Sequence, residues 1–228
     1  DRPAGKGAMG EVYRALDELT GRHVALKVFR SGRGRDPRFE REAEVLAGLS
    51  HPGIVAYLGH GLTDDQVPYL VMEWLEGGDL FSRLRQGTLT VTETLALAAR
   101  LGDALAAAHR IGVVHRDLKP SNVLLVGGRI EAAKLIDFGL ARGESSENYT
   151  SAGETLGTPS YMAPEQARGE QVDSRADMFS LGCVLFECLV GKPPFGDGDP
   201  LAVMARILLD EAPRLGDLVR DTPPGLAH

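Results

Sequence analysis

The sequence is short of cysteine and of long apolar runs, and each shortage excludes a class of protein. Two cysteines occur among 228 residues, Cys183 and Cys188. A gap of five inside a helical pattern does not place them for a disulfide, so we expect buried thiols in a reducing compartment. The apolar stretch Phe179 to Val190 contains Glu187 and is too short for a bilayer, which needs about 20 apolar residues.

Positive charge is also scarce. The chain has 25 Lys and Arg against 32 Asp and Glu, a formal net charge of -7. A nucleic-acid binder usually shows a basic face, so no nucleic-acid partner is expected. The acidic balance suits metal ions or basic substrates, although a solvated acidic surface explains it more simply. No secretory signal is recognisable, and we expect a cytoplasmic chain whose full-length protein could be anchored outside this segment.

The hydrophobic pattern divides the chain into two regions. The first reads mainly as strands, at 11–16, 23–29, 54–58 and 68–73, with one helix at 37–49. The second has helical patterns at 92–109, 175–190 and 201–210, and a short hairpin over 123–136. These patterns predict an α+β fold, with a small β-rich lobe over residues 1–75 and a larger, mainly helical lobe over 76–228.

A glycine-rich motif opens the chain. GKGAMGEV, residues 5–12, has the form G-x-G-x-x-G-x-V, and glycines at this spacing let a backbone turn approach a phosphate without Cβ clashes. A dinucleotide-binding turn of similar pattern needs a helix directly after the glycines. Strand patterns follow here, which argues against that alternative.

A lysine in the next strand requires a partner. In VALK, residues 24–27, alternation puts Ala25 and Lys27 on one face. A lysine among apolar residues on a buried strand is costly unless it is paired, and Glu42 on the following helix is the candidate acid. The alternative is an exposed lysine on an open sheet face.

Chemically active side chains gather farther along. VVHRDLKPSNVLL, residues 113–125, places an acid, a base and an amide in one loop: His115, Asp117, Lys119 and Asn122. LIDFGLA, residues 135–141, puts Asp137 twenty residues after Asp117 with a hairpin between. GTPSYMAPE, residues 157–165, and DMFSLG, residues 177–182, complete six ordered blocks.

Together these blocks resemble the catalytic domain of eukaryotic-like (Hanks-type) serine/threonine protein kinases. The resemblance covers essentially the whole chain, and GKGAMGEVYRA, HPGIV and SLGCVLFE point to bacterial members. It implies a bilobal kinase-like fold. The family has a fuller first strand and further helices after the last block, so the resemblance implies truncation of the domain at both ends.

The resemblance also implies a nucleotide and a metal. The glycine loop would cover the phosphates of ATP, and Lys27 would hold the phosphates while pairing with Glu42. Asp137 and Asn122 would bind Mg²⁺, with Mn²⁺ as a possible substitute. In this loop the expected phosphate contacts are Gly5, Lys6, Gly7, Ala8 and Gly10.

The adenine and ribose contacts would come from both lobes. Apolar side chains and the backbone of the interlobe hinge would hold the base, Met72 would be the gatekeeper, and Asp79 would reach the ribose. The expected base contacts are Val12, Ala25, Glu73, Leu75 and Leu124.

The implied activity is ATP-dependent transfer of phosphate to serine and threonine hydroxyls of proteins, including autophosphorylation. Asp117 would orient the hydroxyl and accept its proton, and Lys119 would neutralise the moving phosphoryl group. Thr158 would contact both. Ser121 stands where many kinases that prefer basic substrates carry Glu, which weakens a basic consensus. The alternatives are a pseudokinase scaffold and a small-molecule kinase.

Other residues are assigned to packing or regulation. Leu46, Tyr57, His115 and Phe138 resemble an internal hydrophobic spine, and Asp177 is expected to brace the 115–122 loop from below. Arg116 resembles an arginine that an activation-loop phosphate neutralises. Either Glu154 partly replaces that phosphate, or Thr155 or Thr150 is autophosphorylated.

Overall fold

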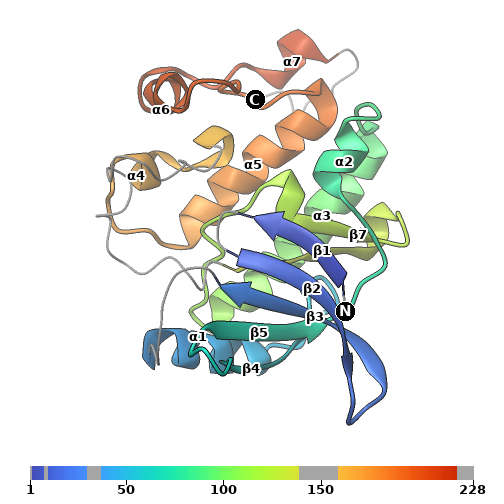
Figure 1. Cartoon of the computed structure of the whole chain (residues 1–228). Helices are drawn as coiled ribbons and strands as arrows, with labels where there is room; N and C mark the ends of the chain where they lie inside the picture. Colours follow the sequence, from blue (N-terminus) through green and yellow to red (C-terminus); the bar gives the residue numbers. More distant parts are fainter. Residues whose placement is uncertain (1, 8–9, 30–36, 139–158, 220–228) are drawn as a thin grey trace.

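The computed structural model describes residues 2–7, 10–29, 37–138 and 159–219. One part is built on a five-stranded sheet with α1, and the other is mainly helical, with α5, α6 and α7 in the upper half of Figure 1. In chain order the elements are β1 (Arg2–Gly7), β2 (Gly10–Asp17), β3 (Arg22–Phe29), α1 (Pro37–Ala47), β4 (Tyr57–Leu62), β5 (Pro68–Glu73), β6 (Gly77–Asp79), α2 (Leu80–Leu84), α3 (Val91–Arg110), η1 (Pro120–Asn122), β7 (Val123–Val126), η2 (Ile130–Ala132), β8 (Ala133–Leu135), η4 (Pro159–Tyr161), α4 (Pro164–Ala167), α5 (Ser174–Val190), α6 (Pro200–Leu209) and α7 (Leu215–Leu218).

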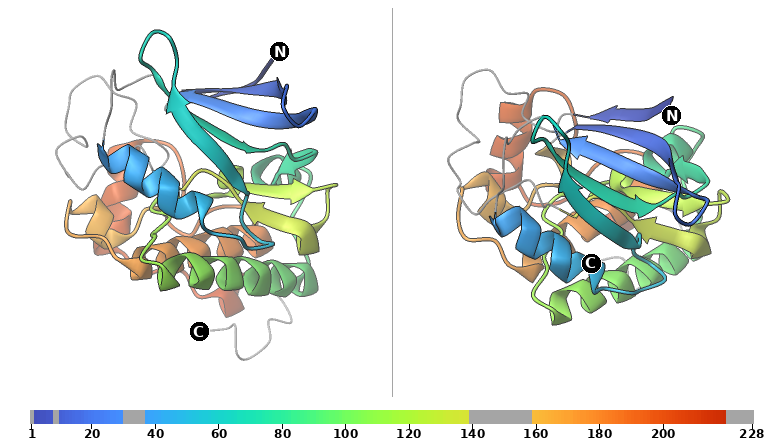
Figure 2. Two further views of the ribbon diagram at one scale, coloured as in Figure 1. Left: turned by 90° about the horizontal axis from the view of Figure 1, so that it is seen from below. Right: turned by 60° about the horizontal axis from the view of Figure 1, so that its bottom comes forward.

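The first part is an antiparallel sheet with strand order β1-β2-β3-β5-β4. Helix α1 packs beside β4 (Figure 2), burying Phe39, Ala43 and Leu46 at the predicted helical spacing. The strand predicted at 54–58 is wrong in its bounds, because β4 begins at Tyr57. The residues before it pair elsewhere: Ile54 forms an isolated parallel bridge with Leu135 and so ties this loop to the second sheet.

The second part surrounds a small sheet with strand order β6-β7-β8. Helix α3 begins at a capping box, in which Thr90 and Glu93 satisfy each other's backbone N–H groups. It packs against α5 and β8. Helix α5 buries Cys183 and Cys188, as predicted, and burial raises the pKa of each thiol to about 12. It ends at Gly191, whose φ of 84° suits glycine.

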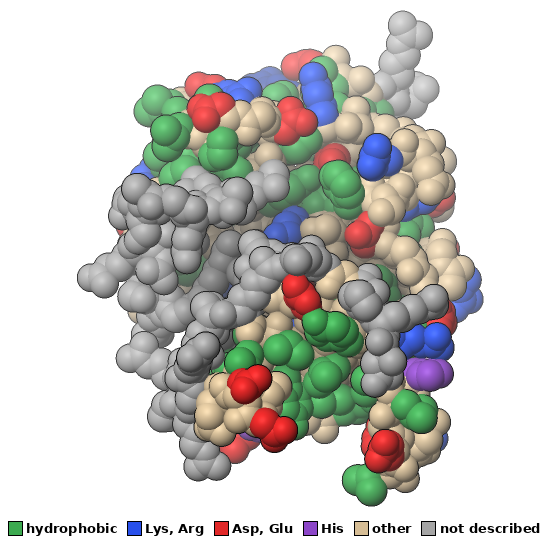
Figure 3. Space-filling view, in the orientation of Figure 1, with side chains coloured by type: hydrophobic (Ala, Val, Ile, Leu, Met, Phe, Trp, Pro, Cys, Tyr) green, Lys and Arg blue, Asp and Glu red, His purple; other side chains and the backbone are tan. Residues whose placement is uncertain are grey.

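The α+β, two-part architecture predicted from the sequence is confirmed. One core cluster runs from Leu46 and Met72 in the first part to Leu101 and Leu118 in the second. Within the described ranges, the helices lack the combined length and apolarity needed to cross a bilayer. On the face shown in Figure 3, charged side chains of both signs are interspersed among the described residues.

Candidate active site

The described residues of the glycine-rich motif lie at the end of β1 and the start of β2. Their register runs from Arg2 opposite Arg14 to Gly7 opposite Gly10, with Lys6 opposite Glu11. Residues 8 and 9, which include the predicted phosphate contact Ala8, lie outside the described residues. A Cβ on Gly10 would stand 2.2 Å from the carbonyl oxygen of Val28, so β3 itself requires glycine there.

Lys27 lies in the middle of β3, opposite Val12 on β2 and Leu70 on β5. Its side chain is buried, as predicted, and its Nζ lies 2.8 Å from Oδ1 of Asp137. The predicted pairing with Glu42 is therefore wrong in this structure. Asp137, which follows β8, is the partner of Lys27 where Glu42 on α1 was expected.

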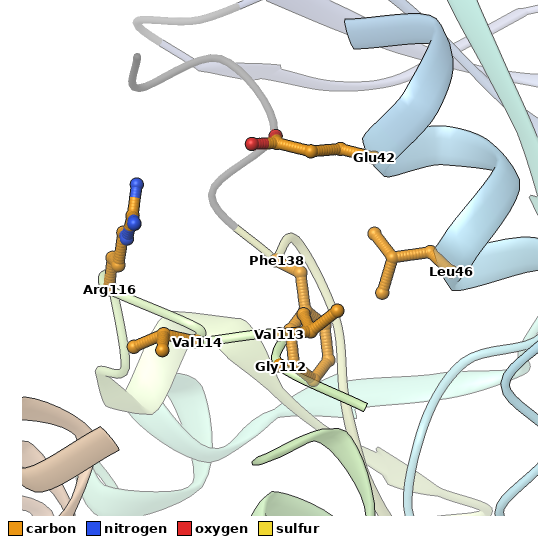
Figure 4. Close-up of a pocket in the computed structure, with 7 residues that line it drawn as sticks. All are labelled: Glu42, Leu46, Gly112, Val113, Val114, Arg116 and Phe138. Atoms are coloured by element: carbon orange, nitrogen blue, oxygen red, sulfur yellow. The ribbon is translucent and has the colours of Figure 1, made fainter. Parts of the chain in front are cut away.

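Glu42 instead reaches from α1 into a cavity of about 80 Å³ (Figure 4). The cavity has a mainly apolar wall and a charged group on each of two sides, Glu42 and Arg116. Its lining residues are Glu42, Leu46, Gly112, Val113, Val114, Arg116 and Phe138. Glu42 therefore faces this cavity, whereas Lys27 pairs with Asp137.

Three residues predicted to act together do lie together in the 115–122 loop. The ammonium of Lys119 is 2.9 Å from Oδ2 of Asp117. The amide of Asn122 donates to the backbone carbonyl of Asp117 at 2.7 Å and to its Oδ2 at 3.2 Å. The carboxylate of Asp117 is therefore held by a cation and an amide from its own loop.

Asp177 holds this loop from α5, and its predicted bracing role is confirmed. Its two carboxylate oxygens accept the backbone N–H groups of His115 and Arg116, each at 2.8 Å. His109, near the end of α3, places Nε2 2.7 Å from Oδ2 of Asp177. Because Asp177 is only 1% exposed, this carboxylate depends on these partners for its stability.

The predicted internal spine residues are all buried. The rings of His115 and Phe138 lie 4.6 Å apart, and His115 Nε2–H donates to the carbonyl of Ile136 at 3.0 Å. Leu46 and Tyr57 continue the buried set toward the first sheet. Burial raises the pKa of the Tyr57 hydroxyl, and the nearby charge of Asp137 adds to the shift.

Two residues of the site have left-handed backbone conformations although neither is glycine. The φ angles of Arg116 and Asp137 are 62° and 59°. Such conformations cost about 1–2 kcal/mol for an L-residue and persist only when the surroundings hold them. Strain next to Asp117 and at Asp137 indicates a pre-organised site.

The segment between the two parts carries a brace that the sequence did not predict. Glu73, at the end of β5, accepts the N–H of Ala56 at 2.8 Å through Oε1, and the same atom pairs with the ammonium of Lys134 on β8. Nearby, Trp74 Nε1 donates to Glu76 at 2.7 Å. The Glu73 side chain therefore links both sheets, which no local pattern in the sequence could indicate.

The residues predicted around the base come from four strands, β2, β3, β5 and β7, and from the segment after β5. Val12 lies in β2 and Ala25 in β3, with Ala25 opposite Met72 of β5. Leu124 lies in β7 opposite Asp79. Asp79 caps α2 by accepting the N–H of Ser82 at 2.7 Å, so it has a structural role beside the predicted ribose contact. Leu75 follows β5 and is half-buried.

Several predicted residues fall outside the described ranges. They belong to the 139–158 segment: Thr150, Glu154, Thr155 and Thr158. The described residues on either side of this segment are Asp137, near its start, and the 3-10 helix η4 (Pro159–Tyr161), directly after it.

The described groups suit a negatively charged ligand with a hard cation. Lys27 and Lys119 supply positive charge from opposite parts of the molecule. Asp137 supplies a carboxylate and Asn122 an amide, and oxygen atoms of these kinds are the ligands that Mg²⁺ prefers. The residues present therefore fit a metal-bound phosphate ligand.

Comparison with known proteins agrees with this geometry. The family model described as the protein kinase domain matches residues 1–215. A Streptomyces coelicolor protein described as a probable serine/threonine-protein kinase is 43% identical over 217 residues, which is 91% of this chain and 32% of that protein. The serine/threonine-protein kinase PknB of Mycobacterium tuberculosis is 41% identical over 209 residues, 87% of this chain and 33% of PknB.

A solved structure shows the same likeness. The crystal structure of Rad53 1–466 in complex with AMP-PNP superposes with a TM-score of 0.74 at 32% identity, covering 91% of this chain and 52% of that one. The chain spans about a third of the length of the curated relatives named here.

Proposed function

The chain belongs to the protein kinase family, and from that premise we propose that it transfers the γ-phosphate of ATP to serine and threonine hydroxyls of proteins, its own included. The observation that carries the proposal is the cluster of Asp117, Lys119 and Asn122 in one loop, together with the Lys27–Asp137 pair, which joins β3 to the segment after β8. We also propose that residues 1–75 and 76–228 act as its two lobes.

The nucleotide would lie between these lobes. Gly5, Gly7 and Gly10 would cover its phosphates, and Lys27 would neutralise phosphate charge. The base would contact Val12, Ala25 and Leu124 and hydrogen-bond to the backbone of Glu73 and Leu75, with the ribose near Asp79. The pairing of β6 with β7 supports this by placing Asp79 opposite Leu124.

A divalent cation, Mg²⁺ or Mn²⁺, would be held by Asp137 and Asn122 and would supply charge neutralisation for the phosphates. Asn122 is buried, and its Nδ2 is engaged by Asp117, so its side chain is held in one orientation. The pairing of Asp137 with Lys27 keeps that carboxylate beside a cation. The oxygen atoms of these two side chains are of the kind that Mg²⁺ prefers, which supports the assignment of both as metal ligands.

Asp117 and Lys119 would act on the protein substrate. Asp117 would orient the hydroxyl and take its proton, while Lys119 would neutralise the transferred group. Phosphoryl transfer depends mainly on alignment and charge neutralisation. The 2.9 Å pair of Asp117 and Lys119 supports this division of roles.

The test is phosphate transfer from ATP with Mg²⁺ to a generic basic protein, followed by phosphosite mapping. Asp117→Asn keeps the size of the side chain, so we expect an unchanged thermal midpoint and a loss of turnover of about a hundredfold or more. Asp103→Asn, at an exposed position on α3, is the matched control and should keep full activity. Equal turnover in wild type and Asp117→Asn would contradict the assignment.

The same assay separates the alternatives when ATP binding is measured and when sugars and aminoglycosides are also offered as acceptors. A pseudokinase scaffold would bind ATP without transfer, and a small-molecule kinase would phosphorylate sugars or aminoglycosides in preference to protein. Lys27, Asp117, Asn122 and Asp137 are all present, although a scaffold has no chemical need for them. We therefore favour the active protein kinase.

A further inference from the structure

Gln166, directly after the A-P-E sequence, makes two buried hydrogen bonds that connect distant parts of the chain. It lies in the short helix α4 and is only 5% exposed. Its Oε1 accepts the N–H of Ala163 at 3.1 Å, and its Nε2 donates to the backbone carbonyl of Arg116 at 2.9 Å. These two bonds join the segment that follows residue 158 to the 115–122 loop, which carries Asp117.

The residue that receives this bond is strained. Arg116 has a φ of 62° without being glycine. Its N–H donates to Asp177 at 2.8 Å, and its carbonyl accepts from Gln166 at 2.9 Å. A left-handed residue of this kind persists only when its surroundings hold it, and here the two backbone groups are held from α5 and α4.

The held carbonyl belongs to the peptide group that leads into Asp117. Because a peptide group is planar, fixing the oxygen of Arg116 also fixes the direction of the Asp117 N–H. That N–H donates to Nδ1 of His115 at 3.3 Å, which closes the turn. The amide of Gln166 therefore helps to hold the peptide group from which the Asp117 side chain extends.

We propose that Gln166 is a positioning residue for the transfer reaction. It holds the Arg116–Asp117 peptide so that the Asp117 carboxylate points at the substrate hydroxyl. It also couples the 159–167 segment to that carboxylate, since the same side chain bonds to Ala163. This inference rests on the proposed function, in which Asp117 is the catalytic acid–base residue.

Two substitutions at Gln166 distinguish its bond to Ala163 from its bond to Arg116. Gln166→Met removes both while keeping the length of the side chain. A displacement of a catalytic group by about 1 Å can cost a hundredfold in rate. For Gln166→Met we therefore expect kcat to fall by about tenfold or more, while the KM for ATP changes by less than about twofold. Gln166→Glu keeps the acceptor for Ala163 but loses the donor whenever the carboxyl is ionised.

The Gln166→Glu chain adds a pH readout. Burial favours the neutral carboxyl, and a protonated carboxyl can again donate to Arg116. Its kcat relative to wild type should therefore rise as the pH falls from about 8 to about 6. A role limited to filling space would leave this ratio constant.

The control is Ile130→Ala, a buried position in η2, which packs against α3 and β7. It opens a core cavity and lowers stability, yet should keep kcat where the protein is folded. Hydrogen exchange at the amides of Arg116 and Asp117 should quicken in Gln166→Met and stay unchanged in Ile130→Ala.

The outcomes are distinct. Wild-type kcat and unchanged exchange in Gln166→Met would overturn the inference while leaving the proposed function intact. A loss of kcat no greater than that of Ile130→Ala would overturn it as well. A wild-type chain that transfers no phosphate would overturn the proposed function. The exchange comparison would then still show whether Gln166 holds the loop.

Discussion

The sheet part and the helical part hold their site residues in different ways. In the sheet, Lys27 is placed by strand register, with Val12 and Leu70 as its neighbours across the strands. In the helical part, Asp117 lies outside regular structure, and side chains from α4 and α5 hold its loop. A position set by register shares its support among many backbone bonds, whereas the loop depends on a few buried polar groups.

This comparison shows where each part is vulnerable. In the sheet, we expect substitutions to be tolerated when the new side chain leaves the distance between neighbouring strands unchanged. In the helical part, the loss of a single acceptor leaves buried N–H groups unpaired, which costs more than the net value of the bonds.

The largest expected effect is in the helical part. Asp177→Ala removes the acceptor for two backbone N–H groups and the contact to His109, so we expect a loss of about 3 kcal/mol or more in the free energy of unfolding. Asp173→Ala, at the exposed N-cap of the same helix, should cost about 1 kcal/mol. Urea denaturation measures both, and equal losses would contradict the comparison.

The second effect tests the sheet. Gly10→Ala forces a Cβ to within 2.2 Å of the Val28 carbonyl, so the β2–β3 pairing must shift, at a cost of about 1–3 kcal/mol. A Cβ on Gly5 meets no atom within 4 Å, and Gly5→Ala should change stability by less than about 0.5 kcal/mol. Thermal unfolding of both variants measures this. If they tolerated alanine equally well, close strand approach would not be the constraint.

The smallest effect is a pH dependence in the helical part. Burial raises the pKa of the Glu187 carboxyl, Asp197 adds to this, and the 2.6 Å bond donated by Tyr161 opposes it. The folded chain therefore keeps this proton at pH values where the unfolded chain has lost it. The contribution of Glu187 to stability is full below its ordinary pKa of 4.5 and declines as the pH rises.

Glu187→Gln removes that titration. The difference in thermal midpoint, variant minus wild type, should grow as the pH rises from about 5 to about 8. Tyr161→Phe is the companion variant, since it leaves Glu187 without this donor and should steepen the decline in stability. A difference that does not vary with pH would show that Glu187 has the same pKa in both states.

Prediction from sequence succeeded where the contacts are local. Asp117, Lys119 and Asn122 lie within six residues of one another, so a single turn brings them together. It failed for Lys27, because the choice between Glu42 and Asp137 depends on how α1 and β8 lie against β3. It also missed Gln166 and Lys134, whose partners Arg116 and Glu73 are 50 and 61 residues away.

By itself the sequence determined the alternation that buries Lys27, the α+β division of the chain and the order of its motifs, because each follows from neighbouring residues. Only the tertiary structure decided which acid faces Lys27 and which side chains hold the strained Arg116. Those contacts join residues far apart in the chain, and their distances depend on how whole helices and sheets pack together.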